Sequence, residues 1–311
     1  MAHPVSRPSA PAAVPNPTGA RAWLVGARLR TLPAAVVPVA VGTAVAYAQR
    51  PVGLSIRPGR AVLALVVSLA LQVGVNYAND YSDGVRGTDD ARVGPLRLVG
   101  SGVKSPGAVK RAALGAFGVA AVVGLALSAM TSWWLIVVGL AAIAAAWGYT
   151  GGPRPYGYAG LGEVFVFVFF GIVAVAGSAF VQFQRFTGAA LVAAVPVGLL
   201  ATALLVTNNL RDIPGDTEVG KRTLAVRLGD ARTRVFYAAL LLGAFIGIVV
   251  LAVVLRRTWV ILGLLAIPVA AKPLQAVRSG ASGRDLIAVL GATGKVQLVA
   301  GVLVSVGAVL R

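Results

Sequence analysis

Acidic side chains are scarce in this chain, and most of them gather at two places. Seven of the ten lie in two short segments, NDYSDGVRGTDD (79–90) and RDIPGDTE (211–218), each of which follows an apolar stretch. Paired carboxylates repel one another, and at a helix C-terminus they also repel the partial negative charge of the helix dipole. We therefore expect a cation to stabilise each segment.

The available ligand types favour magnesium as that cation. The chain has no cysteine, and its single histidine, His3, lies in the N-terminal segment. Carboxylate and amide oxygens without sulfur or imidazole select a hard ion, and Mg²⁺ shared with substrate phosphates fits best. The aspartates of the two segments that could offer such oxygens are Asp80, Asp83, Asp89, Asp90, Asp212 and Asp216.

The spacing within each segment predicts its local structure. Asp80 and Asp83 are three positions apart and share one face if the preceding helix continues that far. Asp212 and Asp216 flank a Pro-Gly pair, where we expect the helix to break. For either segment alone, an alternative is a polar loop in which Asp, Asn and Gly have ordinary turn roles. Two segments of the same kind, each preceded by Asn, favour a site for phosphate chemistry and suggest two half-bundles that face each other.

The composition determines which elements must position these residues. Of 311 residues, 58% are hydrophobic and 12% are charged, with a mean hydropathy of +0.84, whereas soluble domains carry about 25% charged residues. Apolar stretches of membrane-spanning length recur along the chain, so we predict an all-α polytopic membrane protein embedded in a lipid bilayer, with no nucleic-acid partner. The nine predicted spans are 31–49, 60–79, 108–130, 132–149, 160–183, 189–209, 235–255, 258–277 and 286–310.

The distribution of charge predicts the orientation in the membrane. With the N-terminus inside, twenty Lys and Arg residues lie on the cytoplasmic side and seven on the other, as the positive-inside rule requires. Arg50, Arg57 and Arg60 oppose that rule. All ten acidic residues lie on the cytoplasmic side. Residues 1–26, rich in Pro and Ala, are predicted to be a disordered cytoplasmic tail that precedes one nine-helix domain over 27–311.

Four motifs together resemble the UbiA superfamily of intramembrane aromatic prenyltransferases. They are the first acidic segment with the following RVGPLRLVGSG, NNLRDIPGDTEVGKRTLAVRLG, YTGGPRPYGYAGLGEVFVF and RLRTLPAAVVPVAVG. The resemblance covers residue 27 to the end and implies a nine-helix bundle with two Asp-rich motifs. Gly87 stands where the superfamily usually has its third acid, so either Asp89 or Asp90 would take that role. This longer spacing is similar to that of the branch that prenylates a naphthoate.

The resemblance implies a reaction and a location. A polyprenyl group would pass from polyprenyl diphosphate to 1,4-dihydroxy-2-naphthoate with loss of CO₂ and diphosphate, a step of menaquinone synthesis in the bacterial cytoplasmic membrane. Asp80, Asp83, Asp212 and Asp216 would hold Mg²⁺ and be essential for catalysis. Other residues would bind the diphosphate or support the site: Asn76, Asn79, Arg86, Arg97, Asn208, Asn209, Arg211, Lys221 and Arg222.

The acceptor carries a carboxylate and hydroxyls, so basic or phenolic neighbours are expected. The candidates are Arg30, Tyr149, Arg154, Tyr156 and Lys295. Lys295 lies within the last span, where a lysine either faces a cavity or partner or extends to the membrane surface without a role.

Aromatic side chains offer a second way to stabilise the reaction. The run Phe165, Phe167, Phe169 and Phe170 is either packing surface or a wall that stabilises an allylic cation. The role of Glu163 is left open. Two alternative functions are prenyl transfer to another aromatic acceptor and, because of the many spans and charged residues, secondary transport.

Overall fold

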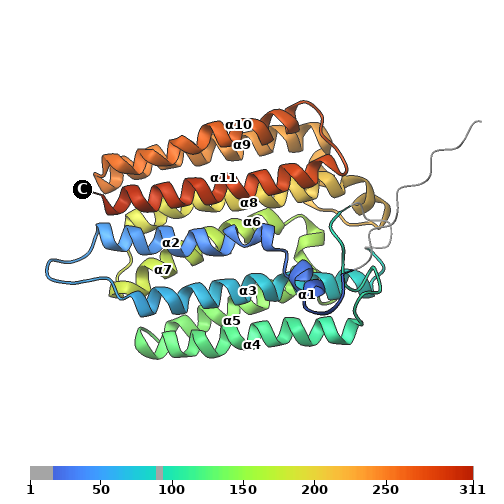
Figure 1. Cartoon of the computed structure of the whole chain (residues 1–311), viewed down its shortest axis with the longest axis horizontal. Coiled ribbons are helices and arrows are strands. Elements are labelled where there is room, and N and C mark those ends of the chain that lie inside the picture. Colours follow the sequence, from blue (N-terminus) through green and yellow to red (C-terminus); the bar gives the residue numbers. More distant parts are fainter. Residues whose placement is uncertain (1–16, 89–93, 311) are drawn as a thin grey trace, which may run out of the picture.

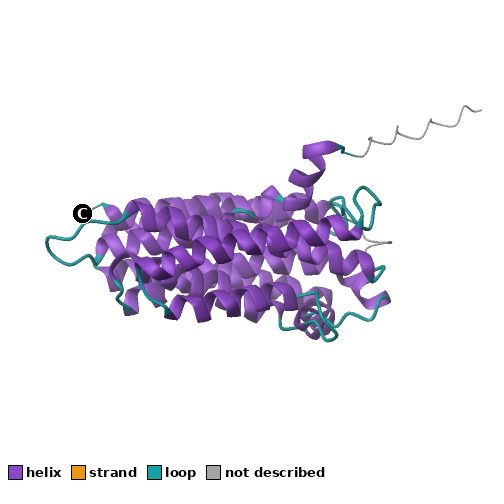
Figure 2. Cartoon of the chain, turned by 90° about the horizontal axis from the view of Figure 1, so that it is seen from below, coloured by secondary structure: helices purple, strands orange, loops and turns teal. Residues whose placement is uncertain are grey.

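The computed structural model describes residues 17–88 and 94–310, and its long helices lie nearly parallel to one another in one elongated bundle, while a short helix near the N-terminus lies at an angle to them (Figure 1). Turning the bundle by 90° shows the same parallel arrangement, and the secondary structure of the described residues is helical throughout (Figure 2). The elements are α1 (Gly19–Ala27), η1 (Leu29–Thr31), α2 (Pro33–Ala48), α3 (Pro58–Val85), α4 (Pro106–Met130), α5 (Trp134–Gly148), η2 (Tyr156–Ala159), α6 (Gly162–Val166), η3 (Phe167–Val173), α7 (Ala174–Phe183), α8 (Gly188–Glu218), α9 (Leu224–Leu255), η4 (Thr258–Ala266), α10 (Ile267–Arg278) and α11 (Asp285–Val309).

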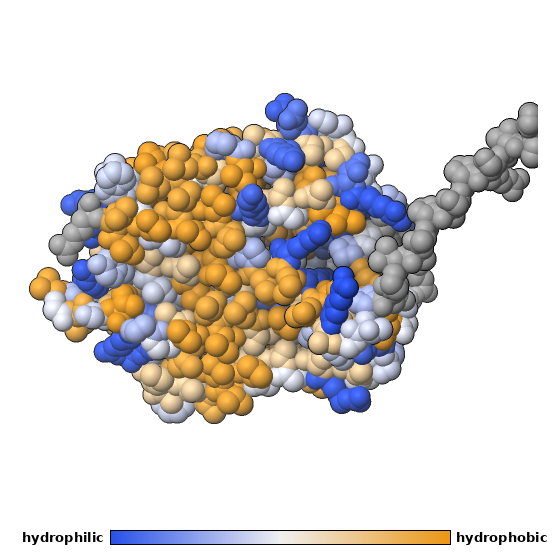
Figure 3. All heavy atoms as spheres, in the orientation of Figure 1, coloured by the Kyte–Doolittle hydropathy of each residue, from blue (hydrophilic) through white to orange (hydrophobic). Residues whose placement is uncertain are grey.

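Among the described residues, seven helices are long and apolar enough to cross a membrane. The pair α1–η1 and α2, bent by 52°, makes an eighth if it counts as one span, and α5 is a shorter apolar helix. Each predicted span overlaps a helical segment, so the all-α polytopic fold is confirmed, while the count of nine spans stays a prediction. An apolar band covers much of the face in Figure 3, and hydrophilic side chains gather toward its right-hand end.

The sequence explains where several helices begin. Pro33, Pro58 and Pro106 occupy first positions of α2, α3 and α4, where proline is pre-organised and its missing N–H costs nothing. The Thr187 hydroxyl accepts a hydrogen bond from the Ala190 N–H and caps α8. Such caps satisfy donors that a helix N-terminus otherwise leaves unpaired.

Two predicted boundaries are wrong. Helix α8 continues through Pro214 to Glu218 instead of breaking. Pro214 lies in the last turns of the helix and is exposed, so its ring and missing N–H disturb only one bond near an end that is frayed in any case. Residues 19–26 are not part of a disordered tail but form most of α1, because Trp23 packs edge-on against Tyr77 at 5.7 Å. The prediction for residues 1–16 lies outside the described residues.

Close helix contacts at glycine build the centre of the bundle. Gly171 of η3 lies against Gly198 of α8, where an added Cβ would meet backbone atoms at 2.8 Å. Small residues permit such approach in membrane proteins. Helix α8 is the most enclosed span, with 72% of its apolar window buried. Element η3 is a π-helix, a form that is frequent at functional sites.

The bundle has two ends, the site end and the far end. The site end carries α1 and the two acidic segments, and the far end carries the loop at 49–57 and the C-terminus (Figure 1). At the far end the buried Arg60 donates hydrogen bonds to the carbonyls of Val181 at 2.9 Å and Met130 at 2.5 Å. Arg60 therefore caps the C-termini of α4 and α7, which accounts for its place on the side that the positive-inside rule disfavours.

Candidate active site

The two acidic segments, far apart in the chain, meet through one lysine. Lys221 follows α8, and its Nζ lies 3.2 Å from Asp83 Oδ1 on α3 and 3.8 Å from Asp216 Oδ1 on α8. The side chains of Lys221 and Asp83 are 10% and 5% exposed, so their attraction is only weakly screened by water. The two acidic segments therefore lie close together, while the division into two half-bundles that face each other stays a prediction.

Asp83 is the centre of this arrangement. Besides Lys221, its carboxylate accepts a hydrogen bond from the Tyr158 hydroxyl at 2.5 Å and lies 3.7 Å from Arg97 Nη2. Burial raises the pKa of the Tyr158 phenol, and the neighbouring Asp83 charge raises it further. Tyr158 therefore stays protonated and donates to Asp83 at neutral pH. This carboxylate is thus held by three groups from outside α3, and the Thr88 hydroxyl adds a hydrogen bond to Asp83 Oδ1 at 3.4 Å.

Asp80 has a different environment from Asp83, although both lie on α3. Its side chain is fully buried, and its two oxygens accept hydrogen bonds from the backbone N–H groups of Leu98 at 2.8 Å and Val99 at 2.9 Å. These bonds hold the segment that places Arg97 beside Asp83. The described contacts therefore make Asp80 the anchor of this segment, and its role as a metal ligand stays a prediction.

Asp212 is held by its own neighbour on α8. Arg211 donates two hydrogen bonds to Asp212, at 2.7 and 2.9 Å, and a third to Asn208 Oδ1 at 2.6 Å. Arg211 is buried. This forked contact fixes the Asp212 carboxylate in one orientation, as bidentate arginine–carboxylate pairs do.

Each of the four predicted asparagines has a different kind of partner. Asn79 accepts a hydrogen bond from the Thr150 hydroxyl at 2.8 Å. Asn76 donates to the Ala27 carbonyl at 2.9 Å and ties α3 to α1, while Asn208 receives the bond from Arg211. Asn209 of α8 donates to Glu163 Oε1 of α6 at 2.9 Å.

Arg86 and Arg222 lie at the rim of the site and are exposed. Arg86 donates hydrogen bonds to the carbonyls of Thr150 and Gly152 and so anchors the loop after α5. The Arg222 backbone N–H donates to the Tyr158 carbonyl at 3.0 Å, which holds the Tyr158 turn beside Lys221. Both arginines therefore support the loops around Asp83 in this structure.

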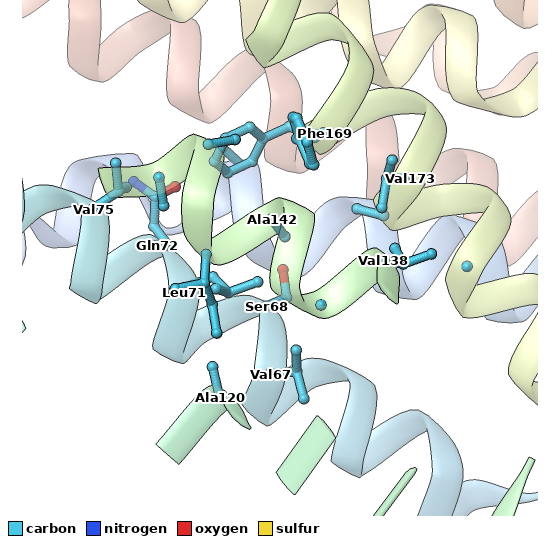
Figure 4. Close-up of a pocket in the computed structure, with 18 of the residues that line it drawn as sticks. Val67, Ser68, Leu71, Gln72, Val75, Ala120, Val138, Ala142, Phe169 and Val173 are labelled. Carbon is cyan, nitrogen blue, oxygen red and sulfur yellow. The ribbon is translucent and has the colours of Figure 1, made fainter. Parts of the chain in front are cut away.

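An apolar cavity of about 460 Å³ begins about one helical turn from the carboxylates. Asn79 and Asn208, which precede Asp83 and Asp212 by four positions, line its polar end. Its remaining lining is mostly aliphatic and comes from α3, α4, α5, η3 and α7, with further residues from α2, α6, α8 and α11. Labelled examples in Figure 4 are Val67, Leu71, Val75, Ala120, Val138, Ala142 and Val173.

The cavity distinguishes among the predicted acceptor residues. Tyr149 and Tyr156 line it, whereas Arg30, Arg154 and Lys295 are exposed and are not among its described lining residues. For Lys295 the cavity interpretation is wrong, because its position on α11 points away from the bundle interior. Its long stem can extend along the apolar surface instead.

Aromatic rings form one wall of the cavity. Tyr156 stacks on Phe165 at 3.9 Å between ring centroids, and Phe165 stacks on Phe169 at 6.0 Å. Phe165, Phe169 and Phe170 line the cavity, whereas Phe167 packs against Gly198 instead. Three of the four rings therefore line the cavity, and a role in stabilising an allylic cation stays a prediction.

Three residues of the site were not predicted from the sequence. Tyr158 lies two positions after Tyr156 in the YTGGPRPYGY motif, and Thr150 follows Tyr149, so both were within a motif already singled out. Arg28 lines the cavity and adopts a left-handed backbone conformation with φ of 53°, which costs energy in a non-glycine residue and is frequent at functional sites. A sequence contains no direct signal for that backbone conformation.

The described residues fit a divalent cation only in part. No group of three or more acidic, His or Cys side chains converges within residues 17–88 and 94–310. Asp83 and Asp216 nevertheless approach one cationic group, Lys221 Nζ, from two helices, which is the arrangement of oxygens that a hard ion requires. The predicted ligands Asp89 and Asp90 lie outside the described residues.

Comparison with known proteins identifies the family. The chain matches the UbiA prenyltransferase family over residues 35–294. This chain belongs to the UbiA prenyltransferase family. A relative named 1,4-dihydroxy-2-naphthoate octaprenyltransferase, from Mycobacterium tuberculosis, is 51% identical over 278 residues, covering 89% of this chain and 93% of the relative. A relative of the same name from Escherichia coli is 42% identical and covers 81% and 83% of the two chains.

Solved structures agree with the UbiA-type fold. A UbiA homologue from Aeropyrum pernix K1, solved without ligands, superposes with a TM-score of 0.68 at 15% identity, covering 88% of this chain and 97% of that chain. A UbiA homologue from Archaeoglobus fulgidus bound to GPP and Mg²⁺ gives 0.64 at 15% identity, covering 91% and 99%. The resemblance deduced from the four motifs is confirmed for the family and the fold.

Proposed function

We propose that this UbiA-family protein transfers a polyprenyl group from polyprenyl diphosphate to 1,4-dihydroxy-2-naphthoate, with loss of CO₂ and diphosphate, and so supplies a demethylated menaquinol. The observation that carries the proposal is the junction of Asp83, Lys221 and Asp216 directly above an apolar cavity. This arrangement suits a substrate with a diphosphate head and a long apolar tail. The names of the relatives supply the acceptor.

The site-end cations suit a departing diphosphate. When the allylic C–O bond breaks, its electron pair remains on the diphosphate, and Lys221 and Arg97 lie where that charge develops. Asp83 orients both groups before the substrate arrives. Once the diphosphate is bound and Lys221 has turned toward it, these cations lower the barrier because they stabilise the charge of the leaving group.

Magnesium is the proposed cofactor, and two Archaeoglobus fulgidus homologues described as bound to Mg²⁺ with a prenyl diphosphate support it. Asp83 and Asp216, with the predicted ligands Asp80, Asp212 and either Asp89 or Asp90, would hold the ion. Bound Mg²⁺ would neutralise diphosphate charge as a Lewis acid. Binding it beside Asp83 requires Lys221 to turn toward the diphosphate, which its flexible stem permits.

The polar end of the cavity suits the aromatic acceptor. Tyr149, Tyr156 and Arg28 line it with the asparagines. Tyr149, Arg28 and the asparagine amides offer donors for the hydroxyls and carboxylate of a naphthoate, whereas the Tyr156 hydroxyl donates to the Ala145 carbonyl and can accept. The ring carbon that carries the carboxylate forms the new bond to the prenyl carbon. The bond to the carboxylate then breaks, CO₂ leaves, and the electron pair restores the aromatic ring.

The orientation of the protein follows from the same chemistry. We infer that the site end faces the cytoplasm of a bacterium and that the bundle spans its cytoplasmic membrane. The excess of Lys and Arg at the site end supports this orientation.

The first experiment is an assay of the purified full-length chain in lipid nanodiscs. A polyprenyl diphosphate is supplied with 1,4-dihydroxy-2-naphthoate, 4-hydroxybenzoate or homogentisate in turn, with Mg²⁺ or with excess chelator. We expect a prenylated product and CO₂ from the naphthoate only, and only with Mg²⁺. The Glu218→Gln variant is assayed beside the unaltered chain as a control for loss of charge in the acidic segments. Glu218 belongs to the second acidic segment but is exposed.

Other outcomes separate the alternatives. Product from another acceptor would retain the reaction class and overturn the acceptor. Product that persists in chelator would overturn the metal. A folded protein that yields no product from any of the three acceptors would overturn the transferase proposal and favour transport.

A further inference from the structure

The cavity extends from the site end almost to the far end. Asn79 and Ala64 both line it and are fifteen positions apart on α3, which is about 22 Å at the rise of an α-helix. Its far end is closed by a cluster of buried side chains that includes Val39, Leu127 and Val181. Behind this cluster, Arg60 ties the ends of α4 and α7 together.

One side of the cavity lacks close helix packing. Helix α5 packs against α3 and α4, but within the described residues no extensive packing joins α5 to η3 or α7. Residues of both sides nevertheless line the same cavity. Val138 and Leu140 of α5 are lining residues that are also 40% and 64% exposed, so the cavity reaches the apolar surface between α5 and α7.

Two glycines face this opening from its two sides. Gly139 of α5 and Gly177 of α7 both line the cavity, and a Cβ added to either would meet nothing within 4 Å. Gly139 is five positions from the far end of α5, and Gly177 is six from the far end of α7. Both therefore lie about 7 to 9 Å from the far end.

We infer that Gly139 and Gly177 determine which prenyl-chain lengths this protein accepts. The inference rests on the proposed function for the identity of the chain. A short prenyl group occupies only the part of the cavity near Asn79. A long one must pass these glycines to leave the bundle between α5 and α7, because the Leu127–Val181 cluster closes the far end. A larger side chain at either position occupies that path without touching the carboxylates.

The test compares chain lengths in four variants. Gly139→Leu and Gly177→Leu are assayed beside Gly115→Leu and Gly118→Leu, whose glycines are exposed on α4, also have open space around them, and do not line the cavity. Each purified full-length variant in nanodiscs receives geranyl diphosphate or octaprenyl diphosphate. We expect the kcat/KM ratio of long to short substrate to fall by about tenfold or more in the first pair, which corresponds to ~1.4 kcal/mol, and to stay unchanged in the second.

A binding measurement keeps this result independent of the acceptor. The rise in melting temperature on adding each diphosphate, without acceptor, should shrink for octaprenyl diphosphate only in the first pair. Equal losses for both chain lengths, or no loss, would overturn the inference. If the unaltered chain forms no product even from geranyl diphosphate, the proposed function fails, and the binding measurement still decides the role of the glycines.

Discussion

The two ends of the bundle use charged side chains in opposite ways. At the far end, the buried Arg60 donates to the Val181 and Met130 carbonyls at helix C-termini. At the site end, Asp83, Lys221 and Asp216 contact one another, and Arg97 adds a second cation. The far-end arginine satisfies groups that the fold itself leaves unpaired, whereas the site end holds charges of both signs that no helix terminus requires.

This contrast between the two ends separates residues that stabilise the fold from residues that act in turnover. A charge that satisfies helix carbonyls should matter for the free energy of unfolding and little for turnover. Charges that neutralise one another in the absence of substrate should matter for turnover, because they exchange partners when a diphosphate binds. Four substitutions test this contrast.

Asp83→Asn should have the largest effect on turnover. The change removes the negative charge that orients Lys221, Arg97 and Tyr158, so we expect kcat to fall by roughly 10³-fold, as for loss of a central electrostatic group. Kinetics with saturating Mg²⁺ and both substrates measure it. The control is that the variant keeps a melting temperature close to that of the unaltered chain. If its kcat stayed within a few-fold of that of the unaltered chain, Asp83 would not be the central group of the site.

Lys221→Met should rank second. Methionine keeps most of the apolar stem and removes the cation between Asp83 and Asp216, so we expect kcat/KM for polyprenyl diphosphate to fall by about 10²-fold. The KM for the acceptor should change little. Lys272→Met, on α10, is the matched control. If acceptor KM rises instead, Lys221 belongs to the aromatic end of the cavity.

Arg60→Met should reverse the pattern. Two helix-end carbonyls lose a charged donor, and we expect the free energy of unfolding to fall by about 3 kcal/mol. Thermal unfolding in nanodiscs checks this value, with Arg57→Met as the control because the Arg57 side chain is exposed. Kinetic constants of the folded fraction should stay unchanged. A loss of turnover without a loss of stability would contradict the division between the ends.

Tyr158→Phe should have the smallest effect. It removes one hydrogen bond to Asp83 and leaves the contacts with Lys221 and Arg97, so we expect a fall in kcat of roughly five- to tenfold, corresponding to about 1 kcal/mol. Tyr81→Phe is the control on the same end of α3. An effect as large as that of Asp83→Asn would make the phenol, rather than the carboxylate, the decisive group.

The fold class and the positions of the two acidic segments could be predicted from the sequence. Hydropathy and helical period are local properties, so each predicted span overlaps a helix, and acids at span ends stand out in a chain with only ten of them. The motifs also identified the family correctly, because the Asp-rich segments and YTGGPRPYGY are short and contiguous.

The role of each acidic residue depends on the tertiary structure. Asp80 and Asp83 look equivalent in the sequence, yet Asp80 binds backbone N–H groups of residues 98 and 99 while Asp83 meets Lys221, 138 positions away. Likewise, Lys295 faces outward and Gly139 faces a cavity, although both lie in apolar runs. Hydropathy is a property of successive residues, so the sequence predicts the helices. Contact, burial and open space arise between helices, so the roles of the site residues depend on how the helices are arranged.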